Sequence, residues 1–176
     1  MRPDMGDDVG ILLLRAVLGL LLTGHGIQKV SFRLGGKGLA GGIQEFASDG
    51  FRGGVYTALA AGLSQIGAGL FLILGLLTPA AAMTAIGVMT VALTVKTKNG
   101  LWVQNDGYEY PLVVIVMAST LSLTGAGHLS FDALLGIDKA PLWIGILASL
   151  VGILAGLAVR LVLHAKPSPI VTGKEN

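Results

Sequence analysis

Five apolar runs dominate this sequence of 176 residues, and each approaches the length of a membrane-spanning helix. A helix needs about 20 apolar residues to cross the hydrocarbon core of a bilayer. The runs cover residues 9–32, 55–77, 79–95, 108–124 and 141–163. The corner between the second and third runs is so tight that these two helices must form an antiparallel hairpin. We therefore predict an all-α integral membrane helical bundle, in which the short fourth run needs help from its ends to span.

The composition supports lipid as the solvent of this chain. Hydrophobic residues make up 53% of it and charged residues only 12%, whereas soluble domains carry about 25% charged residues. The absence of cysteine excludes a disulfide framework, a cysteine nucleophile and iron–sulfur ligation by this chain alone. A net charge of +2 without a basic tract gives no reason to expect a nucleic-acid partner. We expect a multi-pass protein whose first partner is the lipid bilayer of a prokaryotic plasma membrane.

The basic residues predict how the bundle is oriented. Of the 12 Lys and Arg residues, Arg15 lies inside the first run, two lie on the side of the N-terminus and nine lie on the other side. Basic loops stay in the cytoplasm. The N-terminus is therefore predicted outside and the C-terminus in the cytoplasm, provided that run 108–124 spans.

The segments outside the apolar runs are polar. Residues 1–8 are expected to form an N-terminal tail, and residues 164–176 a disordered C-terminal tail. Residues 33–54 form the largest polar connection, in which the stretch IQEFASDG suits a short amphipathic helix at the membrane interface.

Small residues form a stripe on one face of the last run. Its members are Gly145, Ser149, Gly152 and Gly156. Small residues at this spacing let a second backbone approach closely in lipid. The stripe predicts either packing within the bundle or an interface with a partner or a second copy.

The first run carries three ionisable side chains, and such groups are costly in lipid. Arg15 is either a structural anchor that snorkels toward the interface or pairs with Asp7 or Asp8, or a contact for a substrate or quinone. Lys29 suits an anchor at the membrane interface. His25 is the stronger candidate for proton exchange, because an imidazole can accept and donate a proton near neutral pH.

Further polar candidates lie in the second run and before the fourth. Gln65 would be a buried amide that either joins helices or lines a ligand cavity. Glu109 would stand in the first helical turn, where the helix dipole favours an anion. It either caps that helix or meets His25 or Lys29 in a proton-exchanging corner.

The histidines do not suit a haem, and the residues give no metal-ligand spacing. His25 and His128 are expected on opposite sides of the membrane, and His164 at the end of a helix. The chain is therefore not expected to hold a haem, an iron–sulfur cluster or a metal ion.

Taken together, these segments resemble the DoxX family. The first run reads LLLRAVLGLLLTGHGIQKV, the second leads into TPAAA, and the fourth follows KNG and GYEYP. The resemblance implies a four-helix domain over residues 9–135, to which the helix at 141–163 is an addition. It also implies an association with redox systems, thiosulfate:quinone oxidoreductases among them. Carried over by position, the candidate site residues are Arg15, His25, Gln28, Lys29, Asn99, Tyr108 and Glu109.

The chain departs from many relatives in its second run. It has Ser64-Gln65 where they read Ala-Glu. This departure argues against proton coupling through the second helix, because an amide cannot relay protons as a carboxylate does.

Three hypotheses for function remain at this point. The first is a membrane subunit of a quinone-linked redox complex, in which His25, Gln65 and Tyr108, with Lys29, form a quinone pocket. Such a chain would be at most one subunit of a thiosulfate:quinone-type oxidoreductase, with electrons supplied by another redox protein. The second is a non-catalytic scaffold that recruits redox or oxidative-stress enzymes or associates with itself. The third is a small transporter, which would need inverted repeats or broken helices that the sequence does not clearly show.

Overall fold

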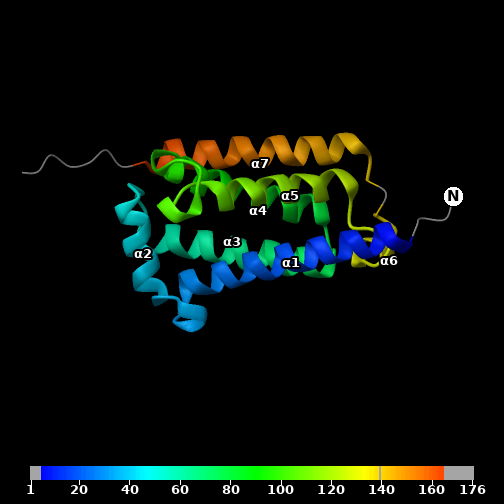
Figure 1. The fold of residues 1–176 in the computed structure, drawn as a ribbon, viewed down its shortest axis with the longest axis horizontal. Coiled ribbons are helices and arrows are strands. Elements are labelled where there is room, and N and C mark those ends of the chain that lie inside the picture. Colours follow the sequence, from blue (N-terminus) through cyan, green and yellow to red (C-terminus); the bar gives the residue numbers. More distant parts are fainter. Residues whose placement is uncertain (1–4, 139, 165–176) are drawn as a thin grey trace, which may run out of the picture.

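The computed structural model describes residues 5–138 and 140–164, and this part of the chain is all-α (Figure 1). The α-helices are α1 (Met5–Val30), α2 (Gly38–Ser48), α3 (Val55–Leu74), α4 (Thr78–Lys96), α5 (Glu109–Thr124), α6 (Phe131–Leu134) and α7 (Leu142–Leu163). Three short 3-10 helices lie in the connections, namely η1 (Arg33–Gly35), η2 (Thr97–Asn99) and η3 (Val103–Asn105).

Helices α1, α3, α4, α5 and α7 run side by side along the long axis of the molecule (Figure 1). Helix α2 lies across one end of this bundle and α6 lies at the other, so we call these the α2 end and the α6 end. Helices α1, α3, α4 and α7 are long and apolar enough to cross a membrane. Helix α5 has only 16 residues, about 24 Å, yet it runs between the same two ends. The predicted all-α membrane bundle is confirmed.

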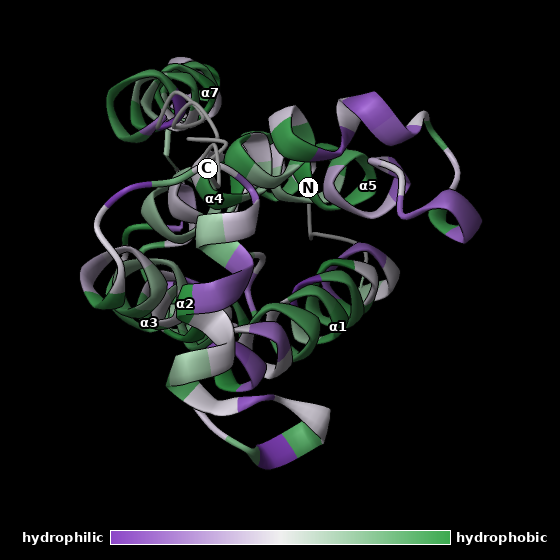
Figure 2. Cartoon of the chain, turned by 90° about the vertical axis from the view of Figure 1, so that its left-hand side faces the viewer, coloured by the Kyte–Doolittle hydropathy of each residue, from purple (hydrophilic) through white to green (hydrophobic). Residues whose placement is uncertain are grey.

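The pattern of buried and exposed side chains in this bundle is the one expected of a protein in lipid. The core contains fully buried Leu18, Leu72 and Ile86, whereas Leu154 and Leu161 on the outer side of α7 are 63% and 80% exposed. Viewed from the α2 end, hydrophilic residues gather in the connections, and the helices behind them are hydrophobic (Figure 2). In water, so much exposed leucine would drive aggregation, but in a bilayer it faces lipid tails.

The hairpin of α3 and α4 turns within three residues, as predicted. Gly75 closes α3 in the left-handed conformation, and α4 begins at Thr78. The carboxylate of Asp132 accepts hydrogen bonds from the backbone N–H groups of Leu77 (2.7 Å) and Thr78 (3.0 Å). The segment around α6 therefore caps the start of α4, whose first N–H groups have no partner within the helix.

Two segments outside the predicted apolar runs are helical. Helix α1 begins at Met5, so residues 5–8, expected in a tail, are helical. Asp7 and Asp8 favour this start because acidic side chains interact well with the N-terminal end of a helix. The short helix predicted between the first two runs is present as α2. The C-terminal tail beyond residue 164 lies outside the described residues.

The small-residue stripe of α7 packs inside the bundle. A Cβ added to Gly152 would stand 2.7 Å from the carbonyl oxygen of Met83, and one added to Gly156 would stand 2.5 Å from that of Gly87. Gly145 lies equally close to the backbone at Ser122 on α5. Close approach to α4 and α5 accounts for these glycines without a partner protein. The hydroxyl of Ser149 donates to the carbonyl of Gly145 within α7 (2.9 Å).

Candidate functional site

A cavity of about 740 Å³ lies toward the α2 end of the bundle. Its wall includes side chains from α1 to α5 and from α7. Small and apolar residues form most of that wall, and a few polar side chains stand among them. His25, Lys29 and Gln65 are three of these, so the fold brings together three candidates that the sequence singled out.

A close crossing of α1 and α3 places His25 and Gln65 near each other along the bundle. A Cβ added to Gly26 would stand 2.6 Å from the carbonyl oxygen of Gly62 and 2.9 Å from the backbone nitrogen of Ile66. Because both glycines lack a side chain, the two backbones touch at this level. His25 is the neighbour of Gly26 and Gln65 lies one turn after Gly62, so both reach the same cavity.

His25 is held in one orientation by Tyr110 and by the backbone of α1. Its ring stacks on that of Tyr110, with 4.8 Å between centroids and 22° between planes. Its Nδ1 lies 2.9 Å from the carbonyl oxygen of Leu21 and 3.3 Å from the hydroxyl of Tyr110. A carbonyl oxygen only accepts, so Nδ1 carries the proton and Nε2 of the neutral ring is left as an acceptor.

Gln65 is an amide without a partner in the wall of the cavity. The residue is 2% exposed, and its Oε1 has no hydrogen-bond partner within the described part of the chain. A buried polar group without a partner costs free energy, of the order of 1–3 kcal/mol. A ligand in the cavity could remove that cost, which makes Gln65 a candidate for ligand contact.

Helix α2 is tied to α1 over the polar end of the cavity. The ammonium of Lys29 donates to Glu45 Oε1 at 3.0 Å and lies 5.1 Å from the centre of the Phe46 ring. Glu45 and Phe46 also line the cavity. A second, polar hollow of about 600 Å³ lies along α2, and His25 and Lys29 line both.

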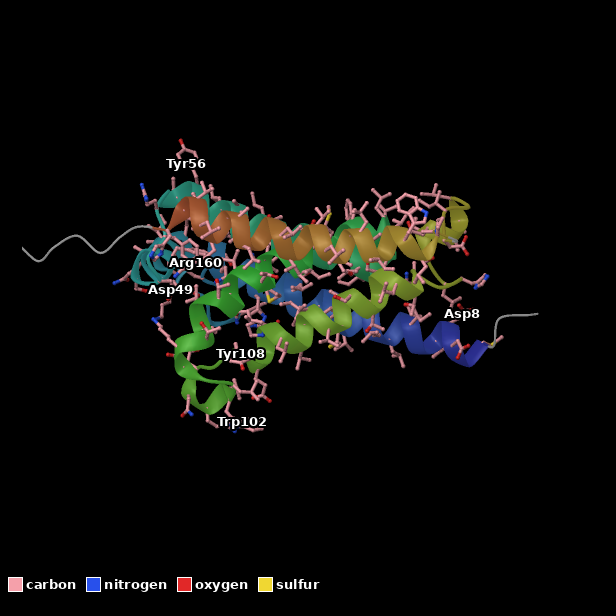
Figure 3. The ribbon with its side chains drawn as sticks, turned by 90° about the horizontal axis from the view of Figure 1, so that it is seen from above. Asp8, Asp49, Tyr56, Trp102, Tyr108 and Arg160 are labelled. Carbon is pink, nitrogen blue, oxygen red and sulfur yellow. The ribbon has the colours of Figure 1, made fainter. Side chains whose placement is uncertain are left out.

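The segment after α2 is tied to the end of α7. The guanidinium of Arg160 donates to the carbonyl oxygen of Asp49 at 3.0 Å and lies 4.8 Å from the centre of the Phe51 ring. Arg52 donates to the carbonyl oxygen of His164 at 2.8 Å. Asp49 and Arg160 lie close together at the α2 end (Figure 3). The segment around α2 therefore joins α1 to α7 and covers this end of the cavity.

The cavity also reaches the lipid-facing surface between α3 and α7. Ala60 on α3 and Ala155 on α7 are exposed, and both line the cavity. Gly87 and Val91 of α4 line it between them. These small side chains leave a groove into which an apolar chain can pass from the bilayer.

The charges that line the cavity are largely paired with one another. Lys29 pairs with Glu45, and Lys96 pairs with Asp106. Asp49 has no such ion pair among the described residues, and burial, with the nearby charge of Glu45, raises its pKa above 3.8. The cavity therefore offers a nearly neutral surface to a ligand.

The raised pKa of Asp49 predicts a pH dependence of stability. Folding disfavours the ionised form, so this residue's contribution to the unfolding free energy is largest below pH 3.8 and is lost as pH rises through the raised pKa. Neighbouring charges on Glu45, Lys98, Lys96 and Lys29 act on the same carboxyl. We expect Asp49→Asn to stabilise the protein at neutral pH and to have little effect in acid.

Chemical unfolding in detergent over a pH series measures this effect. Asp7→Asn is the control, because Asp7 is exposed on the first turn of α1, away from the cavity. A pH profile that Asp49→Asn leaves unchanged would contradict the assignment.

Arg15 lies near the α6 end, away from the cavity, and its expected pairing is wrong. The residue is 1% exposed and its guanidinium donates to the carbonyl oxygen of Leu129, whereas Asp8 accepts from the backbone N–H of His128. The charge that acts on Arg15 is that of Asp132. Arg15 points into the bundle, where the segment before α6 supplies its acceptor.

Glu109 meets the loop before α5 and not His25 or Lys29. Its Oε2 accepts a hydrogen bond from the backbone N–H of Val103 at 3.0 Å. The neighbouring Tyr110 contacts His25 instead. Of the two alternatives for Glu109, the structure shows the one that stabilises the start of α5.

The remaining candidates lie near the α2 end, namely Gln28 in the last turn of α1, Asn99 in η2 and Tyr108 just before α5. Gln28 donates to the carbonyl oxygen of Leu34 at 2.7 Å, and Asn99 donates to that of Asp106 at 3.0 Å. Tyr108 lies on the loop that carries Trp102 (Figure 3). None of the three candidates lines the 740 Å³ cavity.

Tyr110 is the site residue that sequence reasoning missed. Tyr108 and Tyr110 stand two residues apart, so at 3.6 residues per turn they point in nearly opposite directions from a helix. Which of them faces inward depends on the residue at which α5 begins, and sequence patterns fix such boundaries only to within a few residues.

Comparison with known proteins gives one family. The model of the DoxX family matches residues 10–97, from α1 into η2. No curated protein and no solved structure matches the chain. The match includes His25, Lys29 and Gln65, whereas Tyr110 and α7 lie beyond it.

Proposed function

Because the chain belongs to the DoxX family of membrane proteins, we propose that it is the membrane subunit of a quinone-linked redox complex and that its cavity holds the quinone. The observation that carries this proposal is the 740 Å³ cavity itself. Its polar end holds His25, Gln65 and Tyr110, and its apolar groove between α3 and α7 faces lipid.

The shape of the cavity suits an amphipathic, lipid-soluble ligand. A quinone combines a flat ring, two ring oxygens that need hydrogen-bond partners, and an apolar tail. The groove beside Ala60 and Ala155 can take the tail, because both residues are small and face the lipid. The hydroxyl of Tyr110 and the NH₂ group of Gln65 can then donate to the ring oxygens, and Nε2 of His25 can accept from a ring hydroxyl when the ligand is reduced. Ligand pockets are commonly of this kind, apolar with a few placed polar groups.

A redox role requires a partner that supplies or takes electrons. The chain has no cysteine, so a thiol or an iron–sulfur cluster of its own cannot do this. His25 lies at the polar end of the cavity, where it could exchange protons with the ring oxygens. Electrons then pass between the quinone and a membrane-associated redox protein.

We propose that the α2 end faces the cytoplasm of a prokaryotic cell. Seven basic residues of the described ranges lie toward this end, namely Lys29, Arg33, Lys37, Arg52, Lys96, Lys98 and Arg160. Positively charged connections remain on the cytoplasmic side. The partner that exchanges electrons would then dock from the cytoplasm.

Quinone binding by the purified protein tests the proposal directly. The full chain, placed in lipid nanodiscs, is expected to bind a short-tailed benzoquinone, and its deletion is expected to slow quinone-linked oxidation in membranes. Absence of both effects would refute the redox role, and purification in mild detergent with redox enzymes would then favour a scaffold.

Filling the groove should block binding without disturbing the fold. We expect Ala155→Phe to weaken quinone binding by at least about tenfold, because the ring occupies the space of the tail. Ala158→Phe is the matched control, since Ala158 lies on the same helix, is also exposed, and does not line the cavity. Equal affinities of the two variants in a binding titration would contradict this placement of the ligand.

A further inference from the structure

We infer that the cavity binds the quinol, the reduced and phenolic form of its ligand, more tightly than the quinone. This inference rests on the proposed function and adds the redox state of the ligand to it. The two forms have nearly the same size and the same tail. They differ in hydrogen bonding, because a quinone carbonyl only accepts, whereas a quinol hydroxyl both donates and accepts.

The first observation is the acceptor that His25 presents. Its Nδ1 proton is used by the carbonyl oxygen of Leu21 at 2.9 Å, and stacking on Tyr110 holds the ring in place. No other side chain or backbone group among the described residues bonds to Nε2. A quinol hydroxyl can donate to this nitrogen. A quinone carbonyl oxygen would instead place its own lone pair against the lone pair of Nε2, and the two would repel.

The second observation is the unpartnered amide of Gln65. Its Oε1 is buried and lacks a donor within residues 5–138 and 140–164, although the side chain lines the cavity. The crossing at Gly26 and Gly62 holds Gln65 at the level of His25. A hydroxyl can satisfy either end of an amide, whereas a carbonyl can satisfy only its NH₂ group. Both groups therefore discriminate in favour of the quinol.

The third observation is the pairing of charge around the cavity. Lys29 is bonded to Glu45 and Lys96 to Asp106. The charge of each ammonium is therefore balanced by a carboxylate of the protein. The site therefore suits a neutral phenol and not an anionic lipid or a fatty acid.

A comparison of the two redox forms tests the inference on the unmodified protein. The full chain in nanodiscs is titrated, without oxygen, with a short-tailed benzoquinone and with the quinol made from it by dithionite. We expect the quinol to bind about tenfold more tightly, because a site built around a hydroxyl discriminates strongly against an analogue that lacks it. Equal affinities, or tighter binding of the quinone, would overturn the inference. Binding of neither form would instead refute the proposed function.

Substitution of His25 assigns the preference to a residue. His25→Phe keeps an aromatic ring against Tyr110 and removes Nε2, so we expect the ratio of the two affinities to fall toward one while the quinone still binds. His128→Phe is the matched control, because His128 lies at the other end of the bundle, beside Asp8. If His25→Phe does not fold, Gln65→Leu makes the same test, with the same expected fall. A folded variant of either kind that keeps the full preference would exclude that residue as its source.

Discussion

Replacement of Asp132 by Ala is expected to lower the free energy of unfolding by about 3–5 kcal/mol, the usual range when one partner of a buried charge pair is removed. Asp132 is 3% exposed, and its charge acts on Arg15, which is 1% exposed. Nε and Nη1 of this guanidinium have no acceptor within the described structure even when Asp132 is present, so the carboxylate acts on Arg15 through its charge, and its removal leaves that buried cation uncompensated. The N–H groups of Leu77 and Thr78 lose their acceptor as well.

Two further variants distinguish the effect of the Asp132 charge on Arg15 from the role of its carboxylate in capping α4. Asp132→Asn keeps one oxygen for the N–H groups and removes the charge, so we expect a loss smaller than that of Asp132→Ala. Adding Arg15→Met to Asp132→Ala removes the unpaired cation and should recover part of the loss. Unfolding by sodium dodecyl sulfate in mixed micelles, followed by circular dichroism, measures each step. Additive effects of Arg15→Met and Asp132→Ala would show that the two charges are not coupled.

A Cβ at Gly26 is expected to separate α1 from α3 and to abolish ligand binding. In Gly26→Ala the added atom would stand 2.6 Å from the carbonyl oxygen of Gly62 and 2.7 Å from Cγ1 of Ile66. The backbone of α3 cannot rotate out of the way as a flexible side chain can, so α1 and α3 must move apart. Overpacking of this kind costs about 1–3 kcal/mol. The movement also carries His25 away from Tyr110. The loss in the free energy of quinone binding should therefore exceed the loss in the free energy of unfolding.

Gly67→Ala is the matched control for this substitution. Gly67 lies on α3, and a Cβ added there would meet nothing within 4 Å. Alanine favours a helix over glycine by about 0.8–1.0 kcal/mol, so this variant should be as stable as the native protein or slightly more stable. Binding titrations and detergent unfolding of both variants check the prediction. A Gly26→Ala protein that still binds quinone would show that the crossing does not position the site.

The fold of this chain follows from its sequence because the membrane simplifies the problem. Backbone hydrogen bonds in lipid must be made within each segment, so an apolar run of about 20 residues can only be a helix. This requirement determined the all-α bundle, while the short corner at residues 75–77 determined the α3–α4 hairpin and an amphipathic stretch in the polar connection predicted α2. The same reasoning singled out His25 and Gln65, since polar groups in such runs must turn inward.

Only the tertiary structure decided which polar groups meet. Arg15 bonds to Leu129 and not to Asp8, and Tyr110, not Glu109, contacts His25. These pairings depend on the rotation of each helix and on its register against the next, which for α1 and α3 is set by the close contact of Gly26 with Gly62. Hydropathy predicts that a polar side chain turns away from the lipid. It does not predict which group that side chain will contact, because this depends on atoms distant in the sequence.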